Sequence, residues 1–153
     1  MARLSDLSEK MAEHLRVLPC PSFSTTPWAT GPSLDERRLA IISTAGIHLP
    51  DDTPFAVGAA DFRSIPRETS PAELVMSHIS PNFDRTGFAR DPNVAYPHDR
   101  LEEMVKVGEL GSLADENYSF MGATDPAAME TAARKAAGTM KADGVDAILL
   151  VPV

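Results

Sequence analysis

The spacing of apolar residues predicts a helix followed by an extended arm at the start of the chain. Residues 3–17 carry leucines and a methionine three or four positions apart with charged residues between them, the pattern of an amphipathic helix. Pro19 ends this pattern, and residues 19–32 are rich in proline, serine and threonine. We expect this second stretch to be an extended arm that the rings of Phe23 and Trp28 attach to the body.

Short apolar runs predict two buried strands in the middle of the chain, each followed by a long loop. Residues 38–44 (RLAIIST) form the first run and residues 74–79 (LVMSHI) form the second. The loops after them, residues 46–71 and 80–97, contain several prolines and exceed the ordinary length of connections in a compact domain. Because ordered loops of such length are usually functional, we expect a site near these strands.

The C-terminal part of the chain has the strand and helix order of an α/β protein. We expect residues 99–108 to form a helix in which Asp99 and Glu102 make a capping box. Residues 125–143 begin with an aspartate and a proline and stop before a glycine, which favours a second helix. The apolar run 147–153 (AILLVPV) then predicts another strand that is apolar throughout.

These elements predict an α/β fold with three layers and a mainly parallel sheet, of the Rossmann or flavodoxin-like type and incomplete at its C-terminus. Residues 112–113 and 118–121 are expected to be short extended pieces. We expect residues 1–37 to form the N-terminal helix and proline-rich arm, and residues 38–153 to form a single α/β domain.

Composition narrows the classes of function. The 153 residues include 22 acidic and 14 basic side chains, and the formal net charge of −8 repels phosphates, so we expect no nucleic-acid partner. The longest uncharged apolar run is far shorter than the roughly 20 residues that cross a bilayer, so we expect no membrane segment. The single cysteine, Cys20, argues against a disulfide framework and favours a cytoplasmic location. Cys20 lies between two prolines with no neighbouring base, so we expect it to be inert.

Two histidines indicate where a site lies. His48 follows the first predicted strand and His78 lies at the end of the second. Ligands of an open parallel sheet bind outside the carboxyl ends of its strands, and an imidazole there can orient a carboxylate, transfer a proton or bind a metal. Each histidine alone is equally compatible with a hydrogen-bonded structural role. Their placement at the same edge favours a catalytic site.

The long loops and the start of the following helix supply charged candidates: Arg63, Asp84, Arg85, Asp99 and Arg100. An arginine presents two parallel donors that suit a substrate carboxylate. Surface ion pairs and a helix cap are the alternative roles for these residues. We take Arg63, Asp84 and Arg100 as substrate-binding candidates, together with Thr44 at the end of the first strand.

Four stretches carry a resemblance to a known family. They are STAGIHL at 43–49, SIPRETSPAELVMSHIS at 64–80, FDRTGFARDPNVAYPHDRLEEMVKVGELGSLADENYSFMGAT at 83–124 and KADGVDAILLVPV at 141–153. They resemble the selenoprotein B family of glycine, sarcosine, betaine and D-proline reductases, from Arg38 onward. The resemblance is specific because several short motifs, AG-x-H, P-x-DRL, YSFMG and GVDA among them, recur in the same order.

The resemblance implies an oxidoreductase that reductively cleaves a carbon–nitrogen bond in a small amine or amino acid. The family uses a selenocysteine, or a cysteine in some relatives, that follows the strand after GVDA, so we expect this nucleophile directly after Val153. Selenocysteine is encoded by UGA, which is ordinarily read as a stop, so the chain is expected to be truncated and inactive alone. His48 and His78 would then give a proton to the leaving amine, and Arg63 or Arg100 would hold a carboxylate.

The resemblance also implies partners: a pyruvoyl-containing subunit, a small selenoprotein or thioredoxin-like protein, and an oligomer. No cofactor is expected in this chain apart from the selenocysteine of the full-length protein. A non-catalytic subunit that retains the pocket for a small molecule is one alternative function. A metal-dependent hydrolase using His48, His78, His98 and Asp84 is another, although their spacings match no compact ligand motif and we assign no metal ligand.

Overall fold

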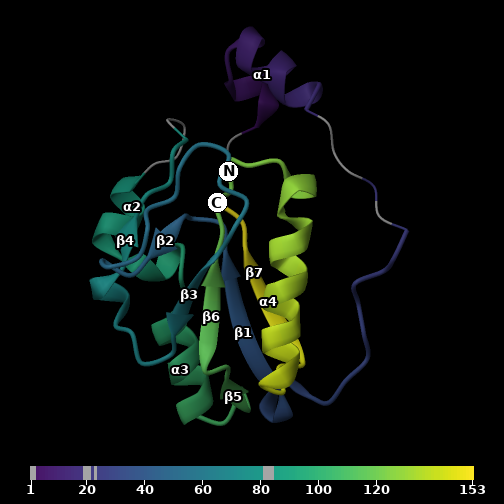
Figure 1. Cartoon of the computed structure of the whole chain (residues 1–153), viewed down its shortest axis with the longest axis vertical. Helices are drawn as coiled ribbons and strands as arrows, with labels where there is room; N and C mark the ends of the chain where they lie inside the picture. Colours follow the sequence, from purple (N-terminus) through teal and green to yellow (C-terminus); the bar gives the residue numbers. More distant parts are fainter. Residues whose placement is uncertain (1–2, 19–21, 23, 81–84) are drawn as a thin grey trace.

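The body of the protein is built around strand β1 (Arg38–Ser43), which pairs with parallel strands along both of its sides. The structure is a computed structural model that describes residues 3–18, 22, 24–80 and 85–153. Four more strands belong to the same sheet: β3 (Arg63–Pro66), β5 (Ser112–Leu113), β6 (Glu116–Ser119) and β7 (Ala147–Val151). Strand β7 lies along one side of β1, and β5 and β6 follow one another along the other (Figure 1). Strand β3 runs antiparallel to β6 and forms that edge of the sheet.

Helices and single turns fill the connections. The α-helices of the described residues are α1 (Glu9–Arg16), α2 (Arg85–Arg90), α3 (His98–Lys106) and α4 (Glu130–Ala142). The 3-10 turns are η1 (Leu4–Asp6), η2 (Leu34–Glu36), η3 (Pro71–Glu73), η4 (Pro92–Val94) and η5 (Pro126–Met129). None of the helices in the described part of the chain has the length and apolar character needed to cross a membrane.

Helix α4 carries the chain from β6 to the parallel strand β7 on the far side of β1, across one face of the sheet (Figure 1). The Asp125 carboxylate accepts a hydrogen bond from a backbone amide of η5 at 3.0 Å, which starts the helical segment. Gly144 ends the segment with a φ of 76°, a conformation that glycine adopts without strain. The predicted helix over residues 125–143 is therefore confirmed.

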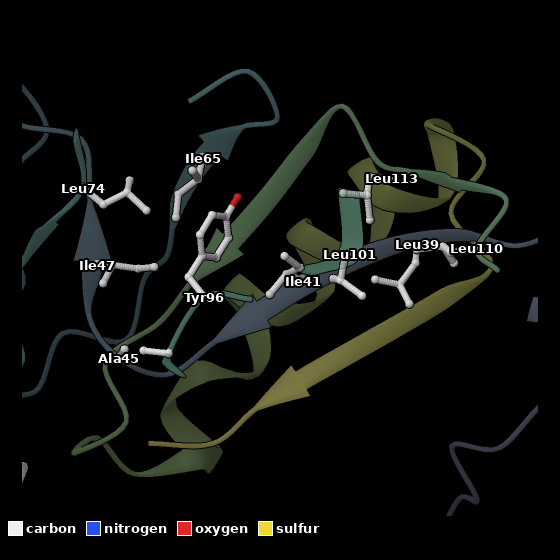
Figure 2. Packing of buried hydrophobic residues seen from close by; sticks show 11 residues of the cluster. Leu39, Ile41, Ala45, Ile47, Ile65, Leu74, Tyr96, Leu101, Leu110 and Leu113 are labelled. Carbon is white, nitrogen blue, oxygen red and sulfur yellow. The ribbon is translucent and has the colours of Figure 1, made fainter. Parts of the chain in front are cut away.

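Side chains of β1 alternate between two hydrophobic clusters, one on each face of the sheet. Leu39 and Ile41 lie in the larger cluster with Leu101 of α3 (Figure 2). Ala40 lies in the other cluster with Ala136 of α4, and these small side chains allow the helix to approach the sheet closely. Helices on both faces of a mostly parallel sheet confirm the predicted three-layer α/β fold.

The last strand is confirmed, and it is only partly buried although it is apolar throughout. Strand β7 pairs with β1 over five residues, in register from Leu39 opposite Ala147 to Ser43 opposite Val151. Ile148 is nevertheless exposed on the face that carries α4. The apolar sequence predicts the strand correctly, but it does not reveal how far α4 extends over the strand.

The predicted strand over residues 74–79 is wrong in both length and partner. Only β4 (Val75–Met76) is extended, and it pairs antiparallel with β2 (Ile47–His48) in a separate two-stranded sheet. The Ser77 amide continues this pairing by donating a hydrogen bond to the Gly46 carbonyl at 3.0 Å. A short apolar run predicts an extended segment, but its composition does not determine which sheet the segment joins.

Helix α3 begins one residue earlier than predicted, and this shift removes the expected capping box. Pro97 occupies the N-cap position without a side-chain cap, and the Asp99 amide donates to the Asn93 side chain at 3.1 Å. Glu102 then lies too far into the helix to reach its start. It instead accepts two hydrogen bonds from the Arg67 guanidinium at 2.7 and 3.1 Å, which ties α3 to the end of β3.

The N-terminal segment forms an arm, but not in the way that was predicted. A 3-10 turn and the shorter helix α1 replace the single helix over residues 3–17, because Ser8 caps α1 with its hydroxyl. Residues 24–37 run along the outside of the molecule to β1 (Figure 1). Trp28 is 87% exposed, so its ring does not attach the arm to the body. The other residues of interest here, Phe23 and Cys20, lie outside the described residues.

Candidate functional site

The carboxyl ends of three parallel strands meet at one edge of the sheet, where ligands of open α/β sheets bind. Beyond β1, the Thr44 amide donates to the Val151 carbonyl of β7 at 3.1 Å. Beyond β6, the Gly122 amide donates to the Thr44 carbonyl at 2.9 Å. The C-terminus of the chain lies at this edge (Figure 1).

His48 is buried in β2, four residues beyond Thr44. Its Nδ1 lies 2.6 Å from the Leu49 carbonyl, and because a carbonyl only accepts hydrogen bonds, Nδ1 carries the proton. The neutral ring therefore presents an unprotonated Nε2, which has no hydrogen-bond partner among the described residues. The ring also meets Phe55 edge-on, with centroids 6.4 Å apart. Such a nitrogen can accept a proton and later return it.

His78 is also buried, and it follows β4 beside the turn that leaves β1. A Cβ atom on Gly46 would lie 3.2 Å from the backbone N and Cα of His78, so the two segments are in close contact. Burial, and then the positive charge of Arg85, lower the pKa of His78. Nδ1 of His78 accepts from the Ser80 amide at 3.2 Å, so the neutral ring carries its proton on Nε2.

The sequence suggested that the two histidines lie at the ends of neighbouring parallel strands. The structure places them differently. His48 belongs to the small antiparallel sheet, where it pairs with Val75 and where Ile47 pairs with Met76. His78 lies two residues beyond Met76, on the side of the Gly46 turn. The accessory sheet thus brings the backbone of His78 to the Gly46 turn that leaves β1, by a route different from the predicted one.

Arg63 starts β3, opposite Ser119 at the end of β6, and so lies at the same edge. Its guanidinium donates to the Thr53 carbonyl at 2.8 Å and to the Asp61 carboxylate at 2.8 Å. The guanidinium carbon also lies 4.5 Å from the centre of the Phe55 ring. Its Nη2 has no hydrogen-bond partner among the described residues, so one donor nitrogen is available to an anion.

Phe55 is the site residue that the sequence reasoning missed. Its buried ring contacts both His48 and Arg63, and its amide donates to the Ser77 hydroxyl at 2.8 Å. It therefore links two candidate residues with the segment that carries His78. The available signal was an aromatic residue next to a proline in a polar loop that also contains Phe62.

The other predicted substrate-binding residues have different surroundings. The Thr44 hydroxyl contacts Val153, accepting from its amide at 2.8 Å. Arg100 is 60% exposed on α3 and pairs with Glu103 at 3.0 Å. Asp84 lies outside the described residues. The structure therefore groups Arg63 with His48 through the Phe55 ring and keeps Arg100 on the helix surface.

A surface hollow of about 430 Å³ lies next to His48 in the chain, lined by Leu49, Pro50, Asp51, Asp52, Thr69 and Glu73. Two of its carboxylates bind local backbone: Asp52 accepts from the Leu49 amide at 3.2 Å and Glu73 from the Ser70 amide at 3.2 Å. Across residues 3–18, 22, 24–80 and 85–153, no three histidine, cysteine, aspartate or glutamate side chains are arranged to hold a metal ion. The metal-dependent alternative therefore gains no support from the described residues.

The fold and the edge site define a three-layer α/β protein with buried imidazoles beside the carboxyl ends of its strands. The family model of glycine/sarcosine/betaine reductase selenoprotein B matches residues 10–153, and the chain belongs to this family. The match confirms the resemblance drawn from the sequence motifs. It also includes most of the N-terminal arm, where those motifs gave no match.

Two curated relatives describe the family more closely. The chain is 31% identical to the D-proline reductase subunit gamma of Acetoanaerobium sticklandii over 120 residues, which cover 76% of this chain and 49% of that protein. It is 28% identical to the betaine reductase complex component B subunit beta of Peptoclostridium acidaminophilum over 126 residues, 76% of this chain and 28% of that protein. The chain thus spans about half or less of these relatives. No solved structure matches it.

Proposed function

We propose that this chain is part of a reductase subunit that cleaves a carbon–nitrogen bond in a small amine or amino acid. The nucleophile is a selenocysteine or cysteine at the position directly after Val153. Membership of the selenoprotein B family supports the reaction class. The observation that carries the proposal is the place of Val153, bound to Thr44 at the edge where β1, β6 and β7 end.

The chemistry assigns a task to each buried group at this edge. Replacing a C–N bond by C–H and N–H bonds consumes two electrons and two protons. A selenolate or thiolate attacks the carbon and forms a C–Se or C–S bond, and the amine leaves as it gains a proton. A thiol of the partner then attacks the chalcogen, so that the carbon leaves with a proton and a selenenylsulfide or disulfide remains, which the partner's second thiol reduces. His48 accepts a proton on Nε2, which has no partner among the described residues, and returns it to the leaving nitrogen, and His78 is the second candidate for proton transfer.

Arg63 binds the carboxylate of an amino-acid substrate through Nη2. Its other nitrogens are fixed by Thr53 and Asp61, so little side-chain freedom remains to be lost when the anion binds. Arg100 and Asp84 are the further substrate-binding candidates. The relatives named as a D-proline reductase subunit and a betaine reductase component support a substrate of this class.

Protein partners supply the electrons and prepare the substrate. Both relatives are named as parts of multi-subunit reductases, which supports a complex for this chain too. We propose a pyruvoyl-containing subunit that activates the amine, and a small selenoprotein or thioredoxin-like dithiol that returns the oxidised nucleophile to its reduced form. Because a selenolate or thiolate needs a reducing compartment, the proposal places the reaction in the cytoplasm.

The codon that follows Val153 in the gene, together with the mass of the natural protein, tests this proposal. We expect a UGA followed in frame by a cysteine-containing segment, or a cysteine codon, and a natural protein that extends beyond Val153. With UGA, the intact mass contains one selenium atom. A UAA or UAG codon, or a UGA with no in-frame continuation containing cysteine, would contradict the proposal.

A further inference from the structure

All polar groups of Thr44 make hydrogen bonds to neighbouring chain segments. Their partners are the last residue of β7 and the residues that follow β6 and β7. Its amide donates to the Val151 carbonyl at 3.1 Å, and its carbonyl accepts from the Gly122 amide at 2.9 Å. Its hydroxyl accepts from the Val153 amide at 2.8 Å and lies 3.4 Å from the Val153 carbonyl. One residue at the end of β1 therefore fixes the chain leaving both neighbouring strands.

The Thr44 hydroxyl binds the chain that follows β7, beyond the point where the backbone hydrogen bonds between β1 and β7 end. The register between β1 and β7 ends at Ser43 opposite Val151, and the next residue of β7 is Pro152, which has no N–H group to donate. The amide of Val153 is the next donor along the chain, and it binds the Thr44 side chain rather than a backbone carbonyl. A valine or alanine at position 44 would leave this amide without its acceptor.

Gly122 makes the other side of this junction. A Cβ atom at this position would lie 2.7 Å from the Val153 carbonyl oxygen and 2.9 Å from the Thr44 carbonyl oxygen. Both distances are shorter than real Cβ contacts, and both neighbours are backbone atoms that cannot rotate away. Glycine is therefore required by the close approach of the three chain segments.

We infer that Thr44 and Gly122 are positioning residues that hold Val153 and so set the place and direction of the residue that follows it. We call the contacts of Thr44 and Gly122 with Val153 the clamp, and this clamp rests on the hydrogen bonds and close contacts above. Its importance for chemistry rests on the proposed function, in which the next residue is the nucleophile. Thr44 acts through the chain in this role, in place of the substrate contact expected from the sequence.

The first test measures the clamp in the full-length protein by hydrogen exchange of the Val153 amide, followed by NMR. Thr44→Val removes the hydroxyl at nearly constant shape, and Thr44→Ser keeps it. We expect Thr44→Val to accelerate exchange of this amide by about fivefold or more, and Thr44→Ser to leave it close to the wild-type rate. Unchanged exchange in Thr44→Val would overturn the inference.

The second test uses the full-length protein with cysteine at the position after Val153 and with Cys20→Ser, which removes the single cysteine of residues 1–153. The rate at which iodoacetamide alkylates the new cysteine is followed against pH, by the mass of the peptide that contains it. We expect Thr44→Val and Gly122→Ala to shift this pH profile away from that of the wild type. Thr44→Ser should keep a profile close to that of the wild type. A profile that is the same in all variants would overturn the positioning role.

These readouts separate the inference from the proposed function. Exchange and alkylation report the clamp without any substrate. If both respond as expected while no form of the protein cleaves an amine, the proposed function fails and the clamp stands. If the wild-type form cleaves an amine and Thr44→Val leaves exchange and alkylation unchanged, the proposed function stands and the positioning role fails.

Discussion

The guanidinium of Arg63 stacks on Phe55, with its central carbon 4.5 Å from the centre of the ring. On the same ring, His48 makes an edge contact. The phenyl group thus fixes the distance between a cation and an imidazole that come from different segments of the chain. This relationship makes Phe55 the structural centre of the candidate site.

Replacing Phe55 by alanine should therefore destabilise the protein more than an ordinary loop substitution. We expect the free energy of unfolding to fall by about 3–5 kcal/mol, because a buried aromatic ring is lost and a cavity remains. Val57→Ala is the matched control in the same loop: Val57 is 86% exposed, and its loss should change stability by less than about 0.5 kcal/mol. Urea denaturation measures both. Equal effects would show that the Phe55 ring is not packed as described.

Gly46 offers a test of the turn that holds His78. Gly46 has a φ of 62°, and an added Cβ would lie 3.0 Å from the Met121 side chain and 3.2 Å from the His78 backbone. Gly58 has a similar φ of 74° with nothing within 4 Å, so it controls for backbone strain alone. We expect Gly58→Ala to cost about 1–2 kcal/mol of unfolding free energy, and Gly46→Ala to cost about 1–3 kcal/mol more. Similar losses would mean that the contact with His78 tolerates a methyl group.

The titration of His78 should depend on Arg85. Burial, and then Arg85, lower the pKa of His78, so Arg85→Gln should raise this pKa toward its ordinary value, as followed by NMR of the ring. The pKa of His78 is lower in the folded state than in the unfolded state, so the unfolded state binds a proton first as the pH falls. Stability is then full above the unfolded pKa and falls as the pH drops through the window between the two values. A pKa that is unchanged in Arg85→Gln would show that burial alone sets it.

Glu102 should contribute stability that depends on pH. The Arg67 guanidinium, through its hydrogen bonds, holds the pKa of Glu102 below its ordinary value. The contribution is present above the unfolded pKa and is lost as pH falls through the folded pKa. We expect Glu102→Gln to lower the unfolding free energy by about 1–2 kcal/mol at pH 7, and this difference to shrink below pH ~4. A difference that is constant with pH would contradict the ion pair.

The sequence predicts those elements whose own residues determine their structure. The helix around α4 is correct because its aspartate cap, first proline and terminal glycine are all local signals. Strand β1 is correct because an apolar run of that length suits a central strand. Strand β3 was missed because its segment, RSIP, has no periodicity, and its pairing with β6 comes from a contact far away in the chain.

In the candidate site too, residues chosen from local sequence were predicted, and those whose role depends on distant contacts were not. His48, His78 and Arg63 were chosen by residue type and by their place after strands, and the structure puts all three near the chain that leaves β1 and β6. Phe55 could not be predicted, because its role depends on two contacts across the fold. The role of the Thr44 side chain likewise depends on a hydrogen bond with Val153, which lies 109 positions away in the chain.

We propose reductive amine cleavage by a chalcogen nucleophile that follows Val153. The most direct measurement is turnover of glycine, sarcosine, betaine and D-proline by the full-length protein with its co-purified partner subunits and a dithiol reductant. The account predicts release of the free amine, or opening of the proline ring, for at least one substrate. It also predicts no turnover when the residue after Val153 is alanine, or when the 153-residue chain replaces the full-length one. Equal turnover by all three forms would contradict the account.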